Sequence, residues 1–263
     1  MNFYQNIEEI FLYKNGILEL HFNDFSEELD VFIFSEIISY ALTKFGDKKI
    51  ESIIINGKSN ISEKRKLVKK VLLELFGIQK STEDFSDYIK IFSNKNEFYA
   101  SGEKILKKLG EIGLSDDTSY LIFSSLGEII DNSFFHNLGR WTTPFGPKCF
   151  FYFYNNKKEK QLNFVISDLG IGFKGTLKNN FPELDTEKDA LQIALKPGIT
   201  GRYENKGGNG LVFLQKNIFN GFKGELFIRS NNFIAKVDSF AEISEIRNDV
   251  KILGTMVKFD LFY

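Results

Sequence analysis

The strongest constraint on the fold is a change of hydrophobic period near residue 148. Before it, Ala100 to Gly113 and Ser115 to His136 carry apolar residues at helical spacing. Ser115 can cap the second helix, and the two aspartates after it suit the positive end of the helix dipole. After it, short apolar segments predict strands at Phe150 to Asn155, Gln161 to Ser167, Gly224 to Ser230, Phe233 to Val237 and Thr255 to Phe262. This part of the chain is therefore expected to contain both helices and a sheet.

A long polar stretch interrupts the predicted strands. Gly170 to Gly210 is rich in glycine and polar residues, with a helix-like piece near Thr186 to Leu195. Compact domains seldom contain so long a connection without a functional reason. We therefore predict that this stretch serves the function of the protein.

The first third of the chain alternates strand and helix patterns. Strands are expected at Gly16 to Phe22 and Ile50 to Asn56, and helices at Glu27 to Phe45 and Ser62 to Phe76. This β-α-β-α order predicts a small α/β domain over residues 1–85, to which the sequence assigns no role. The polar segment Gln79 to Asp87 is the candidate boundary, and residues 86–263 form the second predicted domain.

The charges are balanced, with 34 lysines and arginines against 35 aspartates and glutamates. A field that draws the whole molecule to nucleic acid or anionic lipid is therefore not expected. The predicted helix Ser62 to Phe76 nevertheless carries a basic cluster, Lys64, Arg65, Lys66, Lys69 and Lys70. These residues would bind nucleic acid or an acidic partner, or form a solvated helix face. The second interpretation is favoured, because no aromatic or glycine pattern accompanies the charges.

Cysteine and histidine are scarce. The single cysteine, Cys149, cannot form an internal disulfide, and with only two histidines a Cys/His zinc cluster is not expected. The N-terminal residues lack a basic flank followed by an apolar stretch, and no uncharged apolar run approaches the roughly 18 residues of a membrane helix. We expect a soluble, cytoplasmic protein without membrane contact.

The helix Ser115 to His136 presents one polar stripe. Glu128, Asn132 and His136 are spaced by four residues, so successive side chains drift by only about 40° around the helix. A carboxylate one turn from an amide oxygen can activate a water molecule while the amide helps to hold Mg²⁺. The same spacing also occurs in amphipathic helices that have no site.

Two glycine motifs follow along the chain. Asp168-Leu-Gly170-Ile-Gly172 comes directly after a predicted strand, where its carboxylate could accept a hydrogen bond from an adenine amine in a narrow pocket. Gly207-Gly-Asn-Gly210-Leu211 opens a helix-like segment and could present backbone N–H groups to phosphate oxygens. Either motif alone also fits an ordinary turn or helix cap. The dipeptide Gly254-Thr255 carries almost no information by itself.

In their order along the chain, these four motifs resemble the N, G1, G2 and G3 boxes of the GHKL superfamily, which has the Bergerat-type ATP-binding fold. This superfamily contains gyrase B-type topoisomerases, heat-shock chaperones, MutL, histidine kinases and anti-sigma-factor serine kinases. The resemblance covers roughly residues 95–263. It implies a two-layer α/β sandwich with a mixed sheet, preceded here by the small N-terminal domain.

The resemblance also implies a role for each matching residue. Glu128 matches the general base that activates the nucleophile, and Asn132 matches the magnesium ligand. Asp168 matches the aspartate that reads adenine, supported by Thr255 through a shared water. Gly170 and Gly172 would shape the base pocket.

The phosphates of Mg·ATP would lie under a mobile lid, residues 173–206. The phosphate-binding backbone would come from Gly207, Gly208, Asn209, Gly210 and Leu211. Thr200, Arg202 and Lys196 lie in the predicted lid and could reach the phosphates, although the family pattern fixes none of them.

Two functions remain open from the sequence. The first is a stand-alone ATPase or serine-kinase-like regulator that acts on a partner protein or a second copy of itself. The second is a nucleotide-gated binding module with little or no turnover. Autophosphorylation on histidine is not expected, because His21 falls in a strand pattern and His136 lies within the first motif.

Overall fold

The structure is a computed structural model, and it describes residues 7–21, 31–45, 47–56, 68–73, 76, 88–136, 148–199, 209–246 and 252–263. Its helices are η1 (Ile7–Ile10), α2 (Val31–Phe45), α4 (Lys95–Tyr99), α5 (Gly102–Glu111), α6 (Asp116–His136), α7 (Gly172–Leu177), α8 (Glu187–Ala194), α9 (Gly210–Lys216) and the π-helical turn η2 (Asn217–Gly221). Residues 68–73 are also helical. The fold is mixed α/β, as the sequence predicts.

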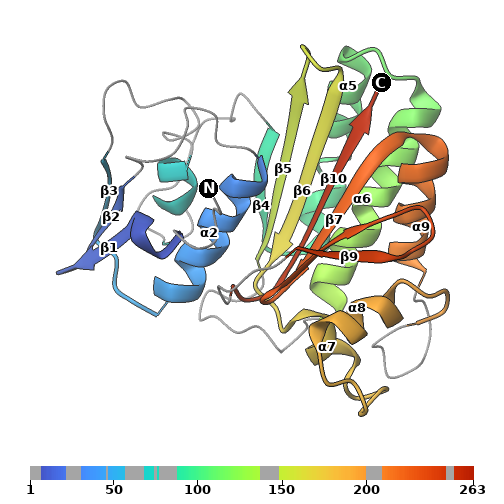
Figure 1. Cartoon of the computed structure of the whole chain (residues 1–263). Helices are drawn as coiled ribbons and strands as arrows, with labels where there is room; N and C mark the ends of the chain where they lie inside the picture. The colour runs from blue at the N-terminus through green and yellow to red at the C-terminus, as the bar shows by residue number, and fades with distance from the viewer. Residues whose placement is uncertain are drawn as a thin grey trace.

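The strands form two sheets (Figure 1). A three-stranded sheet has the order β1 (Phe11–Lys14), β2 (Ile17–His21), β3 (Ser52–Asn56). A seven-stranded sheet has the order β4 (Tyr88–Phe92), β5 (Cys149–Asn156), β6 (Gln161–Asp168), β10 (Thr255–Phe262), β7 (Lys223–Ser230), β8 (Phe233–Val237), β9 (Ile243–Ile246). Figure 1 shows helices α5, α6 and α9 on one side of the large sheet, and α2 with the small sheet on the other side.

The expectation of a mixed sheet is wrong for the seven-stranded sheet. All pairings between its described strands are antiparallel. Strands β6 and β7 run in the same direction, and the chain between them contains helices. Two strands joined in this way could be parallel neighbours in a sheet. The strand β10 lies between them and pairs antiparallel with both, so no parallel pair forms.

Most of the predicted elements are confirmed. The helices α5, α6 and α8 and the strands β5, β6, β7, β8 and β10 lie at or within two residues of their predicted positions. Ser115 caps α6, because its hydroxyl accepts a hydrogen bond from the Thr118 N–H at 3.2 Å. The sequence analysis missed β1, β4, β9, α4 and α7, each of which has six residues or fewer and is too short for a periodic pattern to single out.

Alternating side chains of the large sheet serve two cores. On one face the rings of Phe153, Phe164 and Phe259 stack, with centroids 4.9 Å and 4.8 Å apart for successive pairs. They belong to one buried cluster with Leu126 of α6 and Leu214 of α9. This face therefore carries the α6 layer, which brings the predicted polar stripe beside the sheet.

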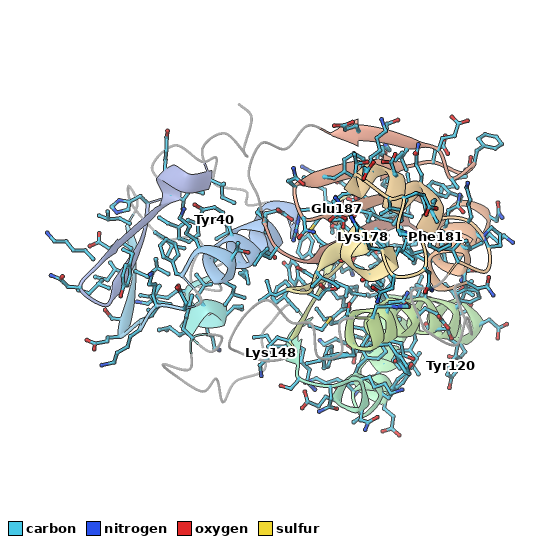
Figure 2. The ribbon with its side chains drawn as sticks, turned by 90° about the horizontal axis from the view of Figure 1, so that it is seen from below. Tyr40, Tyr120, Lys148, Lys178, Phe181 and Glu187 are labelled. Carbon is cyan, nitrogen blue, oxygen red and sulfur yellow. The ribbon has the colours of Figure 1, made fainter. Side chains whose placement is uncertain are left out.

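The opposite face of the large sheet is covered by the N-terminal elements. Ile37 and Ala41 of α2 are buried in the same cluster as Phe150, Val165 and Met256 of the sheet. Figure 2 shows the two layers from below, with Tyr40 of α2 and Tyr120 of α6 on opposite sides of the molecule. The N-terminal elements thus share a core with the sheet, while the predicted division into residues 1–85 and 86–263 stays a prediction.

Part of the N-terminal prediction falls outside the described residues. This holds for Lys64, Arg65 and Lys66 and for the boundary segment Gln79 to Asp87. The strands β2 and β3 and the described part of the predicted helix Glu27 to Phe45 are confirmed. Of the basic cluster, Lys69 and Lys70 are described, and both are half-buried.

Candidate functional site

A cavity of about 720 Å³, including its part open to solvent, lies between α6, the ends of β6 and β10, and helices α7 and α9. Seven residues that the four motifs single out line it, namely Asn132, His136, Asp168, Gly172, Gly210, Leu211 and Thr255. Apolar side chains complete the wall, among them Ile129, Ile166, Phe173 and Val257. An apolar cavity with a few convergent polar groups is the usual form of a small-molecule site.

Asp168 is the most firmly held polar group of the cavity. Its Oδ1 accepts hydrogen bonds from the Gly170 N–H at 2.9 Å and from the Thr255 N–H at 3.0 Å. Only 4% of Asp168 is exposed. Gly170 does not line the cavity. Its contribution is the hydrogen bond that orients this carboxylate.

Gly254 lets the last strand approach Asp168 closely. Its φ is +87°, and a Cβ atom there would lie 2.0 Å from the Asp168 carbonyl oxygen. No side chain fits here, because the Asp168 carbonyl oxygen belongs to the backbone and cannot move aside as a flexible side chain could. Glycine at this position is what allows the next residue, Thr255, to reach the carboxylate. The shared water that the resemblance implies stays a prediction.

Burial raises the pKa of Asp168 above its ordinary value. The two backbone N–H groups, the Ser133 hydroxyl and the charge of Arg229 act in the opposite direction. Burial destabilises the ionised form of this carboxylate. A carboxylate in such an environment that also faces a cavity is more typical of a functional group than of a structural one.

Of the predicted polar stripe on α6, two residues line the cavity and one does not. Asn132 and His136 line the cavity, whereas Glu128 is exposed and lies at its edge. A Cβ atom on Gly210 would lie 2.9 Å from Glu128 Oε2 and 3.0 Å from Asn132 Nδ2. The first and third motifs, about 80 residues apart in the sequence, are therefore in direct contact.

The remaining predicted residues lie around α9 or outside the described residues. Leu211 is in the cavity wall, and Asn209 Oδ1 accepts a hydrogen bond from the Gly198 N–H at 3.1 Å, which joins the two ends of segment 199–208. Outside the described residues are Thr200, Arg202, Gly207 and Gly208.

The described part of the predicted lid is folded against the core. Leu177, Leu184, Leu191 and Leu195 are buried in the same cluster as the α6 side of the sheet. Phe173 and Thr176 of α7 line the cavity. In this structure residues 173–199 therefore pack on the core and contribute part of the cavity wall, while the mobility of the predicted lid stays a prediction. Residues 200–206 of the predicted lid lie outside the described residues.

Glu187 was missed by the sequence analysis, and it holds this wall to the sheet. Its carboxylate accepts hydrogen bonds from the Lys174 N–H at 3.1 Å, the Ser230 hydroxyl at 2.5 Å and the Asn231 amide at 2.6 Å. The Ser230 hydroxyl in turn accepts from the Phe173 N–H at 2.8 Å. Figure 2 labels Glu187 beside α7. A lone glutamate in a polar stretch gives no signal of such a role.

Three further observations concern other kinds of site, namely a thiol nucleophile, a metal cluster and a membrane-spanning helix. Burial raises the pKa of the Cys149 thiol well above its ordinary value, which disfavours the thiolate form that acts as a nucleophile. Among the described residues, no group of three or more histidine, cysteine, aspartate or glutamate side chains is placed to hold a metal ion. No helix within the described ranges is long and apolar enough to cross a membrane.

Comparison with known proteins adds no assignment. No protein-family model matches the chain, and no curated protein matches it. The case for a function therefore depends on the residues of this chain and on the geometry of the cavity.

Proposed function

We propose that the cavity binds Mg·ATP and that the protein is a GHKL-type ATPase or a serine-kinase-like regulator of a partner protein. One observation carries this proposal. Four motifs, spread from residue 128 to residue 255, contribute residues to a single cavity or its edge. Unrelated turns and caps would be expected to scatter over the molecule instead.

The inner end of the cavity fits an adenine ring. Asp168 offers a carboxylate in a buried position, where it can accept a hydrogen bond from an exocyclic amine. Ile166, Phe173 and Val257 provide apolar contacts for a flat ring. A buried acceptor that is matched by a donor gives strong selection for that donor, because ligands that lack it leave the carboxylate unpaired.

The outer end fits a magnesium ion that comes with the nucleotide. Asn132 can supply one amide oxygen, and the absence of a side chain on Gly210 lets α9 approach Asn132 and Glu128 closely. Mg²⁺ commonly takes one or two protein oxygens and completes its shell with phosphate oxygens and water. When bound, the ion would neutralise phosphate charge, while Asn132 would hold it and Glu128 would orient or deprotonate the nucleophile.

The exposure of Glu128 favours one alternative, a nucleotide-gated binding module. In the described structure this carboxylate lies at the edge of the cavity and not within its wall. A base that is reached only after closure, or only beside a partner, leaves the isolated protein a binder with little turnover.

Calorimetry with ATP, with and without Mg²⁺, tests the binding, and release of labelled phosphate tests the turnover. Binding with turnover supports the enzyme, and binding without turnover in any mixture with candidate partner proteins supports the module. Absence of ATP binding by the parent protein would overturn both.

Asn132→Ala should weaken the binding of Mg·ATP more than the binding of ATP in excess chelator. The amide oxygen that the substitution removes is the proposed ligand of the metal ion, so its loss should weaken binding only when Mg²⁺ is present. Calorimetric titrations in the two conditions measure the difference. An Asn96→Ala variant in the exposed helix α4 is the matched control and should show none. Equal losses in both conditions would show that Asn132 only supports the structure.

Mg·ATP should slow proteolysis at residues 200–206. The resemblance places this segment over the phosphates, and contacts there exist only when nucleotide is bound. Trypsin, which can cleave after Arg202 and Lys206, measures the change, and cleavage after Lys158 in the β5–β6 turn is the internal control. A rate at Arg202 that does not respond to a non-hydrolysable ATP analogue would contradict the gating.

A further inference from the structure

Helix α2 presents three polar residues to the large sheet. Glu36, Ser39 and Thr43 are spaced by three and four residues and therefore share one face of the helix. Glu36 and Ser39 are almost fully buried, with 0% and 2% exposed. In Figure 1 this helix lies between the small sheet and the strands β5 and β6.

Glu36 pairs with Arg229 of β7 in the buried interface. Glu36 Oε1 accepts from Arg229 Nε at 2.7 Å, and both side chains are fully buried. The second carboxylate oxygen, Glu36 Oε2, and one guanidinium nitrogen, Arg229 Nη2, have no hydrogen-bond partner among the described residues. The pair is thus incompletely satisfied, which is unfavourable for an interface that only has to be stable.

Arg229 also holds residues 252–254, the segment that precedes Thr255 and contacts Asp168. Its Nη1 donates to the carbonyl oxygens of Ile252 at 3.1 Å and Gly254 at 3.2 Å. Gly254 lies against the Asp168 backbone, and the next N–H, that of Thr255, donates to the Asp168 carboxylate. The ion pair with α2 is therefore two residue contacts away from the carboxylate of the cavity.

Two further contacts of α2 reach the same place. The Ser39 and Ser167 hydroxyls lie 3.0 Å apart, and Ser167 directly precedes Asp168. The Thr43 hydroxyl accepts from the Leu253 N–H at 3.1 Å. The contacts of Ser39 and Thr43 thus end within two residues of Asp168 or of Thr255, and the contact of Glu36 ends on Arg229, which holds Ile252 and Gly254.

We propose that α2 is a positioning element of the nucleotide site, through which the N-terminal region regulates ATP affinity. Docked α2 fixes Arg229 and the segment 252–254, and these fix the carboxylate that reads adenine. Coupling between two sites is reciprocal, so bound ATP strengthens the docking of α2 by the same factor. This inference rests on the proposed ATP binding.

Glu36→Gln should weaken ATP binding by about fivefold or more, the lower end of typical coupling between sites. Thr43→Val is the milder second variant, for use if Glu36→Gln does not fold, and should weaken ATP binding in the same direction. Glu51→Gln breaks an exposed ion pair with Lys49 in the same region and should leave the affinity unchanged. Leu18→Ala removes a buried side chain of the small sheet and controls for loss of stability alone.

Hydrogen exchange of the α2 amides gives the reciprocal readout, which a merely structural role would not change. A non-hydrolysable ATP analogue should slow exchange in residues 36–45 of the parent protein and should not do so in Thr43→Val to the same extent. If the parent binds ATP but Glu36→Gln and Thr43→Val bind it equally well, or if Leu18→Ala weakens binding as much as they do, the inference is overturned and the proposed function stands. If the parent does not bind ATP, the proposed function itself fails.

Discussion

Glu128→Ala is expected to bind ATP about as tightly as the parent protein and to lose a factor of about 10² to 10⁴ in turnover. In the proposed mechanism this carboxylate polarises the attacking nucleophile, so it adds little to the affinity for the ground state. Its removal can even favour binding, since Glu128 and the γ-phosphate are both negative. Because Glu128 is exposed, the variant should fold as well as the parent.

Calorimetry measures the affinity, and release or transfer of the labelled γ-phosphate measures the turnover. Glu111→Ala, which removes an exposed carboxylate from the neighbouring helix α5, is the control and should leave both unchanged. The assay includes candidate partner proteins, because a partner or a second copy can complete the site. If the parent shows no phosphate release or transfer in any mixture while nucleotide still changes partner binding, the protein is a binding module and not an enzyme.

Asp168→Asn is expected to weaken ATP binding by about five- to 150-fold, which corresponds to about 1–3 kcal/mol. The amide keeps the shape of the side chain, and its oxygen can still accept the N–H groups of Gly170 and Thr255. It also directs an N–H group at the adenine amine in place of an acceptor. The loss should therefore fall on the ligand and not on the fold.

The same substitution has a predicted pH dependence. Burial raises the pKa of Asp168 above that of the unfolded chain, so the folded state binds its proton more tightly. This contribution to stability is full below the unfolded pKa, near 4, and is lost as the pH rises through the folded pKa. Relative to Asp168→Asn, the parent protein should therefore become less stable as the pH rises from about 4 toward neutrality.

Thermal unfolding of both proteins across this pH range checks the sign. Asp260→Asn is a control of the same chemistry, because Asp260 is buried in the same sheet but is paired with Lys258 and Asn163. It should lower stability without changing ATP affinity. Unchanged ATP affinity in Asp168→Asn would contradict the assignment of the pocket. A carboxylate that stabilises the parent at neutral pH would show that its hydrogen bonds outweigh its burial.

The parts of the fold that could be predicted are those that depend on local chemistry. Ser115 caps α6 because a hydroxyl at that position satisfies an N–H of the first turn, and this requires no other part of the chain. The strand β8 could be predicted as a short, mostly apolar segment between the polar residues Asn231-Asn232 and Asp238. Asp168 could be singled out only together with the other three motifs in their order along the chain, since a carboxylate followed by two glycines at a strand end also fits an ordinary turn.

The parts that could not be predicted depend on long-range pairing. Glu187 and Ser230 are 43 residues apart, and Glu36 and Arg229 are 193 residues apart. A glutamate in a polar loop and one in an amphipathic helix both resemble ordinary surface residues until the fold supplies their partners. The insertion of β10 between β6 and β7 likewise leaves no local trace, because a strand carries the same alternation whichever neighbour it joins.

The placement of β10 has a consequence for how the protein is made. Of the described strands, β10 leaves the ribosome last, yet it occupies the centre of the sheet. Until it arrives, β6 and β7 each present an unpaired edge to solvent, and such edges invite pairing with other chains. The carboxylate of Asp168 also waits for the Thr255 N–H, which is synthesised 87 residues later. A nascent chain therefore completes its sheet and the cavity at Asp168 in the same step, and a chain that stops before that step exposes the two edges on which aggregation would begin.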